Sequence, residues 1–307
     1  MKLSFLLVQF ICMQVFAGHM RLHVSVIGED QIPVTNAIVK ISKLASPVDR
    51  FFDSPQRITE TNSVDGTGCW QRDMALHSAS VFLSVSALGY YPADTNVRFR
   101  IKRDSALLGP TFVSETSSIN LVLRKRINPI PMYSSKGYRR MPKEGEVWGF
   151  DLQKADWVGP HGRGETADFF VGYRSWQTNE SFRSEGEITF PRFSGYYVRP
   201  KLPVQGIVSS YRADTNATFE TRLTCYATRD EQGYRHKILL EDTEYIVLRT
   251  RVKVDAQGRV QSAHYSKIYG PITLRNREFA YLEAFFNPQE NDTNLEFDHG
   301  RNLLKNR

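Results

Sequence analysis

The stretch that decides the fold reads YIVLRTRVKVDAQGRV and spans residues 245–260. Its first ten residues alternate between an apolar set and a cationic set: Ile246, Leu248, Val252 and Val254 against Arg249, Arg251 and Lys253. Because successive side chains of a strand point to opposite faces, this period of two predicts a β-strand with one apolar and one basic face. Residues 255–258, Asp-Ala-Gln-Gly, predict a type I turn with glycine in the left-handed position, and residues 259–268 return as the second strand of a hairpin.

Strand-like runs also occur elsewhere along the chain, at residues 21–26, 37–41, 80–87 and 119–123. Gly, Pro, Asn and Asp separate these runs at short intervals, and the 3.6-residue period of amphipathic helices is far rarer. The pattern predicts an all-β protein, with an N-terminal seven-stranded-type β-sandwich followed by a second β-rich domain.

Four segments resemble the carboxypeptidase-regulatory-like domain, a transthyretin-like or CnaB-like β-sandwich. They read VSVIGEDQIPVTNAIVKI (24–41), TNSVDGTGCW (61–70), VFLSVSALGYYP (81–92) and INLVLRK (119–125). Four features of the family stand in order: a Gly-Asp turn at 28–30, a Pro-x-x-x-Ala-x-Val step at 33–39, an Asp-Gly turn at 65–66 and a Gly-Tyr pair at 89–90. The resemblance implies a non-catalytic domain over residues 20–126. The C-terminal half separately resembles secreted bacterial proteins that carry this domain at their N-terminus, through the segments INPIPMY (127–133), GFDL (149–152), ADF (167–169), SAHYSKIYG (262–270) and FFNPQENDTNLEFD (285–298).

Two details qualify the resemblance. In the Asp-Gly turn we expect Gly66 to take the positive φ, since glycine does so at little steric cost. Residues 44–60, with two prolines and a Phe-Phe pair, depart from the family as an insertion.

The N-terminus reads MKLSFLLVQFICMQVFAG, with one lysine before an apolar run that ends in small residues. This arrangement predicts a secretory signal peptide over residues 1–17, and no later segment is apolar enough to span a bilayer. We therefore expect an exported protein that is periplasmic, cell-surface or extracellular. The mature chain would keep Cys69 and Cys225, which either pair as a disulfide or remain two separate thiols.

A basic linker, Arg124–Arg126, is followed by Pro129 and Pro131. Two prolines spaced by one residue cannot continue a central strand, so the boundary of the first domain is placed here. Residues 127–307 then form the second, β-rich domain.

The formal net charge is +7, and it falls to +6 when residues 1–17, with one lysine and no acid, are removed. Because the cationic residues are dispersed, the pattern favours a solvated basic face and argues against a nucleic-acid groove. An anionic polymer remains a possible partner, and the oligomeric state is left open.

The stretch GPHGRGETADFF, residues 159–170, combines glycines with His161, Arg163 and Glu165. A phosphate-binding loop requires a helix after it, whereas strand-like alternation resumes here, so we interpret the stretch as a connection between strands and its polar residues as not catalytic. The sequence contains no Gly-x-Ser-x-Gly elbow and no His-Glu-x-x-His motif. No catalytic residue, metal or cofactor is therefore assigned.

Aromatic residues concentrate early in the second domain, beside two arginines. The candidate ligand-binding residues are Trp148, Trp157, Trp176, Tyr173, Arg163 and Arg174. Exposed on a sheet, such residues could stack against a glycan or bind a polyanion; packed inside, they would form a core.

The sequence thus predicts an exported, non-catalytic binding or structural protein of the cell envelope that recognises a glycan or another envelope protein. The alternative is an enzyme acting on envelope or extracellular polysaccharide. Its acids would come from pairs such as Glu144/Glu146 and Glu185/Glu187, two residues apart on expected strands.

Overall fold

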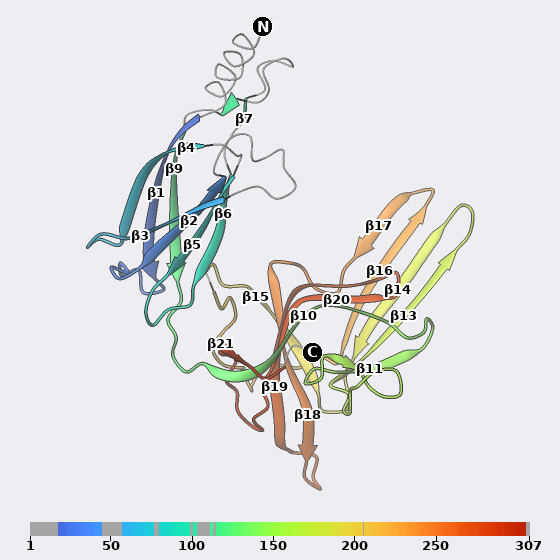
Figure 1. The fold of residues 1–307 in the computed structure, drawn as a ribbon. Helices are drawn as coiled ribbons and strands as arrows, with labels where there is room; N and C mark the ends of the chain where they lie inside the picture. The colour runs from blue at the N-terminus through green and yellow to red at the C-terminus, as the bar shows by residue number, and fades with distance from the viewer. Residues whose placement is uncertain are drawn as a thin grey trace. The chain divides into compact units, whose positions relative to one another are not determined.

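The computed structural model describes residues 18–44, 57–76, 80–98, 101–102, 111–112, 115–204 and 206–304 (Figure 1). The predicted signal peptide lies outside these residues, as does most of the expected insertion at 44–60. Every regular element in the described ranges is a β-strand, which confirms the all-β prediction. Within the same ranges, no helix has the length and apolar character needed to cross a membrane.

The chain divides into two compact units. The first comprises Met1–Arg126 with Pro203–Val208, and the second Ile127–Leu202 with Ser209–Arg307. Residues 203–208 contact the rest of the first unit, where Arg124, which is buried, donates a hydrogen bond from Nη1 to the carbonyl oxygen of Ile207 at 2.7 Å. This return of the chain has no local sequence signal.

The first unit is a sandwich of seven strands in two sheets, with the order β4-β1-β9 in one and β3-β2-β5-β6 in the other. The strands are β1 (Gly18–Gly28), β2 (Ile38–Leu44), β3 (Arg57–Ser63), β4 (Cys69–Leu76), β5 (Ser80–Ser86), β6 (Ala93–Arg98) and β9 (Glu115–Leu123). A separate pair is formed by β7 (Ile101–Lys102) and β8 (Thr111–Phe112). Alternate residues of β5, Val81, Leu83 and Val85, are buried in the core cluster between the sheets, so the predicted seven-stranded type of sandwich is confirmed.

The Asp-Gly turn of the first unit differs in detail from the expectation. Gly68, not Gly66, has the positive φ, at 74°. Asp65 organises the turn, since its Oδ1 accepts hydrogen bonds from the backbone N–H groups of Thr67 (2.8 Å) and Cys69 (3.0 Å). The aspartate side chain thereby moves the left-handed position two residues along the chain.

The second unit contains two six-stranded sheets. One has the order β15-β18-β19-β20-β10-β21 and consists of β10 (Ile130–Arg140), β15 (Gly195–Pro200), β18 (Glu244–Val254), β19 (Val260–Arg275), β20 (Glu278–Phe286) and β21 (Phe297–Asn302). The other has the order β12-β11-β13-β14-β16-β17 and consists of β11 (Val147–Asp151), β12 (Asp156–Trp157), β13 (Phe169–Gln177), β14 (Phe182–Thr189), β16 (Arg222–Asp230) and β17 (Gly233–Lys237). A second β-rich domain is therefore present, as predicted.

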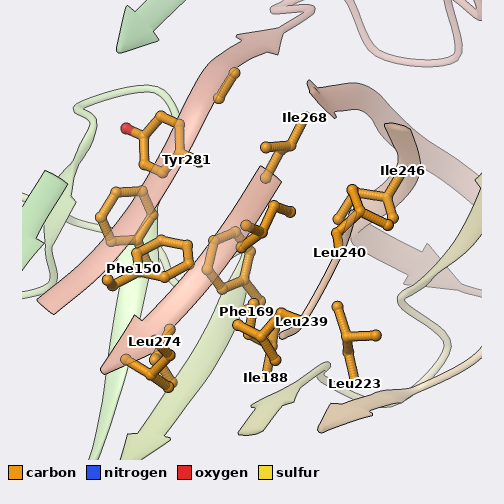
Figure 2. Packing of buried hydrophobic residues seen from close by; sticks show 14 of the residues in the cluster. Phe150, Phe169, Ile188, Leu223, Leu239, Leu240, Ile246, Ile268, Leu274 and Tyr281 are labelled. Carbon is orange, nitrogen blue, oxygen red and sulfur yellow. The ribbon is translucent and has the colours of Figure 1, made fainter. Parts of the chain in front are cut away.

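The core of the second unit lies between these sheets. Figure 2 shows Phe150 and Phe169 in one cluster with Tyr281, Ile268 and Ile246 of the facing sheet. The rings of Phe150 and Phe169 stack with their centroids 5.3 Å apart, and Phe279 meets both edge-on. Aromatic side chains bury a large apolar area each, so these rings contribute to the hydrophobic stabilisation of the unit.

The strand β10 begins at Ile130, so Pro131 lies inside a strand between β20 and β21. Strand β9 of the first unit ends at Leu123, before the two prolines, and β10 tolerates Pro131 next to its first residue. The reason is local: pairing with β21 shifts in register between Ile130 and Met132, where Pro131 has no N–H group to donate.

The hairpin of β18 and β19 has the predicted turn. The N–H of Gly258 donates to the carbonyl of Asp255 at 3.0 Å, and Gly258 has a φ of 78°. The predicted division of the β18 side chains between an apolar and a basic face is wrong, however, beyond Thr250. The register shifts there, and Arg251 takes a φ of 51°. This bulge turns the Arg251 side chain away from the basic face and onto the ring of Phe286, a core residue, 4.5 Å from its centroid.

Candidate functional site

The outer face of the sheet that contains β13 carries the candidate site. Phe169, Val171 and Tyr173 of this strand face the core, so the residues between them lie on the opposite, outer face: Phe170, Gly172, Arg174 and Trp176. The neighbouring strands alternate in the same way, and β16 places Thr224 and Tyr226 on the outer face. The period-two pattern thus separates a packed face from a solvent-facing one.

The register of the strands builds an open groove on this face, here called the sheet groove. One row across the sheet holds Val147, Gly172, Glu187 and Thr224, and the next holds Arg174, Glu185 and Tyr226. The groove has a volume of about 410 Å³ and is lined by Gly145, Glu146, Val147, Gly172, Tyr173, Arg174, Glu185, Gly186, Glu187, Arg222, Thr224, Cys225 and Tyr226. This volume is in the range of ordinary small-ligand sites.

The groove is hollow in part because Gly172 has no side chain. A Cβ atom there would lie 3.4 Å from Cγ2 of Val147 and 3.6 Å from Cγ of Glu187, which are ordinary contacts. A side chain at this position would therefore fit without strain and fill the space between the neighbouring strands. The glycine keeps the floor of the groove open.

The rim of the groove beside β11 is held by hydrogen bonds to β13. Glu144 accepts from both the N–H and the hydroxyl of Ser175 at 2.5 Å, and the N–H of Gly145 donates to the carbonyl of Tyr173 at 2.9 Å. Glu144 therefore has a role in positioning the rim, and it is not paired with Glu146 on a strand as the sequence suggested.

The carboxylates of the groove each have a cationic partner. Oε2 of Glu187 accepts from Nε and Nη2 of Arg222 at 2.8 and 2.7 Å. Glu185 accepts from Arg183, and Glu146 accepts from Lys143. Charge in the groove is thus largely neutralised within the protein.

Arg174 is the exception among the charged residues that line the groove. In the described ranges, no carboxylate lies within ion-pair distance of its guanidinium. Glu185 stands opposite Arg174 in the register but is engaged by Arg183.

Two of the six predicted ligand-binding residues meet on the outer face. Trp176 is 48% exposed, with the Arg183 guanidinium 5.8 Å from its ring centroid, and Arg174 lines the groove. Trp157 and Tyr173 are buried in the core cluster, which is the alternative that the sequence left open. The predicted aromatic platform is therefore smaller than the sequence cluster.

The remaining two predicted residues lie outside the groove. Trp148 is partly buried against the core, where its Nε1 donates to the carbonyl of Lys143 at 3.0 Å. Arg163 binds Asp156, with its Nε 3.3 Å from Oδ2. Neither residue lines the site that holds Arg174.

Sequence reasoning missed Tyr226, Arg222 and Gly172. Tyr226 lies 52 residues after Arg174, and only the pairing of β14 with both β13 and β16 brings these side chains into one row. Alternation within residues 222–226 was the available signal, since it places Arg222 and Tyr226 on one face.

Residues 159–165 connect β12 to β13, as predicted. The loop closes on itself, with the N–H of Gly164 donating to the carbonyl of Trp157 at 2.9 Å and the N–H of Gly159 to the carbonyl of Gly164 at 3.0 Å. His161 is exposed and meets the ring of Trp148 edge-on, at 4.3 Å between centroids. In the described ranges, no three His, Cys, Asp or Glu side chains gather as a metal site.

Comparisons with known proteins identify no family. No protein-family model matches the chain, and no curated protein matches it. Among solved structures, 3-chlorocatechol 1,2-dioxygenase from Rhodococcus opacus 1CP is 11% identical at a TM-score of 0.26, and hydroxyquinol 1,2-dioxygenase from Pseudomonas putida DLL-E4 is 11% identical at 0.24. Each match covers 36% of this chain, and the chain spans 60% and 57% of these two enzymes.

A protein of unknown function from Bacteroides fragilis NCTC 9343 is similar over 90% of this chain and 99% of its own, at 11% identity and a TM-score of 0.18. At such scores these similarities say nothing about activity.

Proposed function

We propose that the protein is an exported, non-catalytic binding protein of the cell envelope and that the sheet groove recognises a glycan. The observation that carries this proposal is the combination of exposed aromatic side chains with charged hydrogen-bonding groups on one open sheet face. Trp176 on β13 and Tyr226 on β16 are 48% and 45% exposed there. Arg174 also lies on β13 and Thr224 on β16, and Glu187 lies on β14, the strand between these two.

The chemistry of a sugar matches this surface. A pyranose ring has an apolar face of C–H groups that stacks on aromatic rings, and its rim of hydroxyls pairs with carboxylates, guanidinium groups and hydroxyls. Phe170, which is 36% exposed on the same strand, extends the aromatic character along the face. A ligand that is long and polar would use more of this surface than a compact apolar one.

Glycan binding is tested by screening the mature chain on an array of envelope and extracellular polysaccharides, followed by calorimetry of the best ligand. We expect Tyr226→Ala and Trp176→Ala to weaken binding at least tenfold. Tyr234→Ala is the matched control, because Tyr234 is 61% exposed but pairs with Arg229, which puts it on the opposite face. Equal affinities for all three variants and the parent would overturn the proposal.

Export and the nature of the first unit belong to the same proposal. The apolar N-terminal run supports export, and the protein purified from outside the cytoplasm should begin near Gly18. The seven strands in two sheets support a carboxypeptidase-regulatory-like first unit that serves as a non-catalytic domain. Retention of Met1 in exported protein would contradict the first point.

One observation favours the alternative of a polysaccharide-degrading enzyme. Glu185 and Glu187 both face the groove, two residues apart on β14, which corresponds to roughly 7 Å along a strand. Glycosidases use carboxyl pairs at about 5–9 Å. Release of reducing ends from a bound polysaccharide, lost in Glu185→Gln or Glu187→Gln, would favour this alternative over simple binding.

A further inference from the structure

We propose that the glycan recognised by the sheet groove is acidic and that Arg174 binds the carboxylate of a uronic acid unit. This inference rests on the proposed function of the groove and adds the charge class of the ligand. It follows from the pairing of the charged groups on the outer face, from the position of Arg174 in the register, and from the aromatic residue in the same row.

The pairing leaves one guanidinium in the groove without a protein carboxylate. Glu187 is bound by Arg222 and Glu185 by Arg183, while Glu146 is bound by Lys143. Arg174 lines the same groove, and the described part of the chain offers it no carboxylate within ion-pair distance. A ligand anion would therefore meet a positive site without displacing an internal ion pair.

The chemistry of an arginine suits a carboxylate. The guanidinium is planar and permanently charged, and it presents pairs of N–H donors that match the two oxygens of a carboxylate. Because Glu185 stands directly opposite Arg174 but is occupied by Arg183, the fork of Arg174 remains available to a ligand. A neutral sugar hydroxyl would use only part of this donor capacity.

The row that contains Arg174 indicates how the ligand lies. Tyr226 is two strands away in the same row, or about 10 Å at the usual strand spacing. Lys237 follows Tyr226 in that row and is exposed, and no carboxylate in the described ranges pairs with it. The geometry favours an oligosaccharide that crosses the strands, with one sugar ring on Tyr226 and a carboxylate on Arg174.

The test measures binding of the full-length mature protein to uronic acid oligosaccharides and to the same oligosaccharides after reduction of their carboxyl groups. The probes are oligogalacturonate, oligomannuronate and hyaluronan fragments, each with its neutral partner. We expect at least one acidic form to bind tenfold or more tightly than its neutral partner. Arg174→Gln should remove that difference, because it should weaken binding of the acidic form far more than binding of the neutral form.

The matched control is Arg229→Gln. It removes the same charge from the same sheet, but Arg229 pairs with Phe182 and Tyr234 in a row whose side chains face the other way. Its affinities should equal those of the parent, and equal melting temperatures would establish that both variants are folded.

Two results overturn the inference in different ways. If glycans bind but the acidic and neutral forms are equal, or if Arg174→Gln and Arg229→Gln weaken binding alike, the ligand class is wrong and glycan binding stands. If neither these probes nor the polysaccharide array show any binding, the proposed function fails, and the inference fails with it.

Discussion

The guanidinium of Arg251 binds Asp168 through two contacts, Nε to Oδ1 at 2.9 Å and Nη2 to Oδ2 at 3.1 Å. The same Nη2 donates to Oδ1 of Asp151 at 2.9 Å. Burial alone would lower the pKa of Arg251, but the hydrogen bonds and charge of Asp168, with those of Asp151, outweigh burial and raise it. The residue therefore ties the β18–β19 hairpin to both ends of the segment that precedes β13.

Arg251→Met should destabilise the protein by about 3–5 kcal/mol, because it leaves two buried carboxylates without their cation. Lys253→Met is the control, since Lys253 is exposed and its pair with Glu290 should contribute less than about 1 kcal/mol. Urea denaturation of the three proteins measures the difference. Similar losses for both variants would mean that the buried cluster contributes no more than a surface pair.

Gly162→Val and Gly164→Val should each lower the free energy of unfolding by about 1–3 kcal/mol through steric overlap. A Cβ atom at Gly162 would lie 2.2 Å from the carbonyl oxygen of Trp157, and one at Gly164 would lie 2.8 Å from the same oxygen. The cause is close approach of the backbone, and neither glycine has a positive φ. His161→Ala, which removes one exposed ring contact, should cost less than either substitution in thermal denaturation; a larger loss would contradict this account.

Gly68→Ala should destabilise the first unit by about 1–2 kcal/mol, whereas Gly66→Ala should change its stability by less than about 0.5 kcal/mol. Gly68 has a positive φ, and a Cβ there would lie 2.7 Å from the carbonyl oxygen of Val26. At Gly66 nothing lies within 4 Å of the added atom. Melting temperatures of the two variants check the order, and a reversed order would place the left-handed residue at 66.

Burial raises the pKa of the Cys225 thiol to about 11, from an ordinary value of 9.0. The unfolded state therefore ionises first, and the contribution of the neutral thiol to stability is complete below pH 9 and lost as the pH rises toward 11. Stability measured across this interval should fall by at most about 1.4 kcal/mol per pH unit from this group. Cys225→Ala should flatten the slope.

Cys69 supplies the control for that experiment. Both thiols are free, but Cys69 is exposed whereas Cys225 is buried, so Cys69→Ala should leave the alkaline slope of Cys225 in place. A maleimide reagent should label Cys69 in the native protein and Cys225 only after unfolding. Equal labelling rates in the native state would show that Cys225 is accessible.

The strands and turns of this protein could be predicted where a short run of neighbouring residues determines the local backbone structure. Alternation at residues 245–250 fixes a strand, and Gly258 supplies the left-handed residue of the following turn. Alternation contains no signal for the bulge at Arg251, whose guanidinium binds two aspartates 83 and 100 residues earlier in the chain.

The residues of the candidate site could likewise be predicted only where they are close together in the sequence. Arg174 and Trp176 share a face because they are two residues apart on one strand, so the sequence could pair them. Tyr226 joins them only through strand pairing. Trp157 entered the predicted set because it is close in sequence to Trp148, and proximity in sequence does not distinguish a platform from a core.

The return of residues 203–208 to the first unit has a consequence for how such a protein can be recombined. The chain crosses between the units after Arg126, after Leu202 and after Val208, so a single cut in the linker would not separate them. A fusion built from residues 18–126 alone would bury Arg124 without the Ile207 carbonyl that it binds at 2.7 Å. Transfer of the first unit to another protein, by evolution or by engineering, therefore requires both of its chain segments.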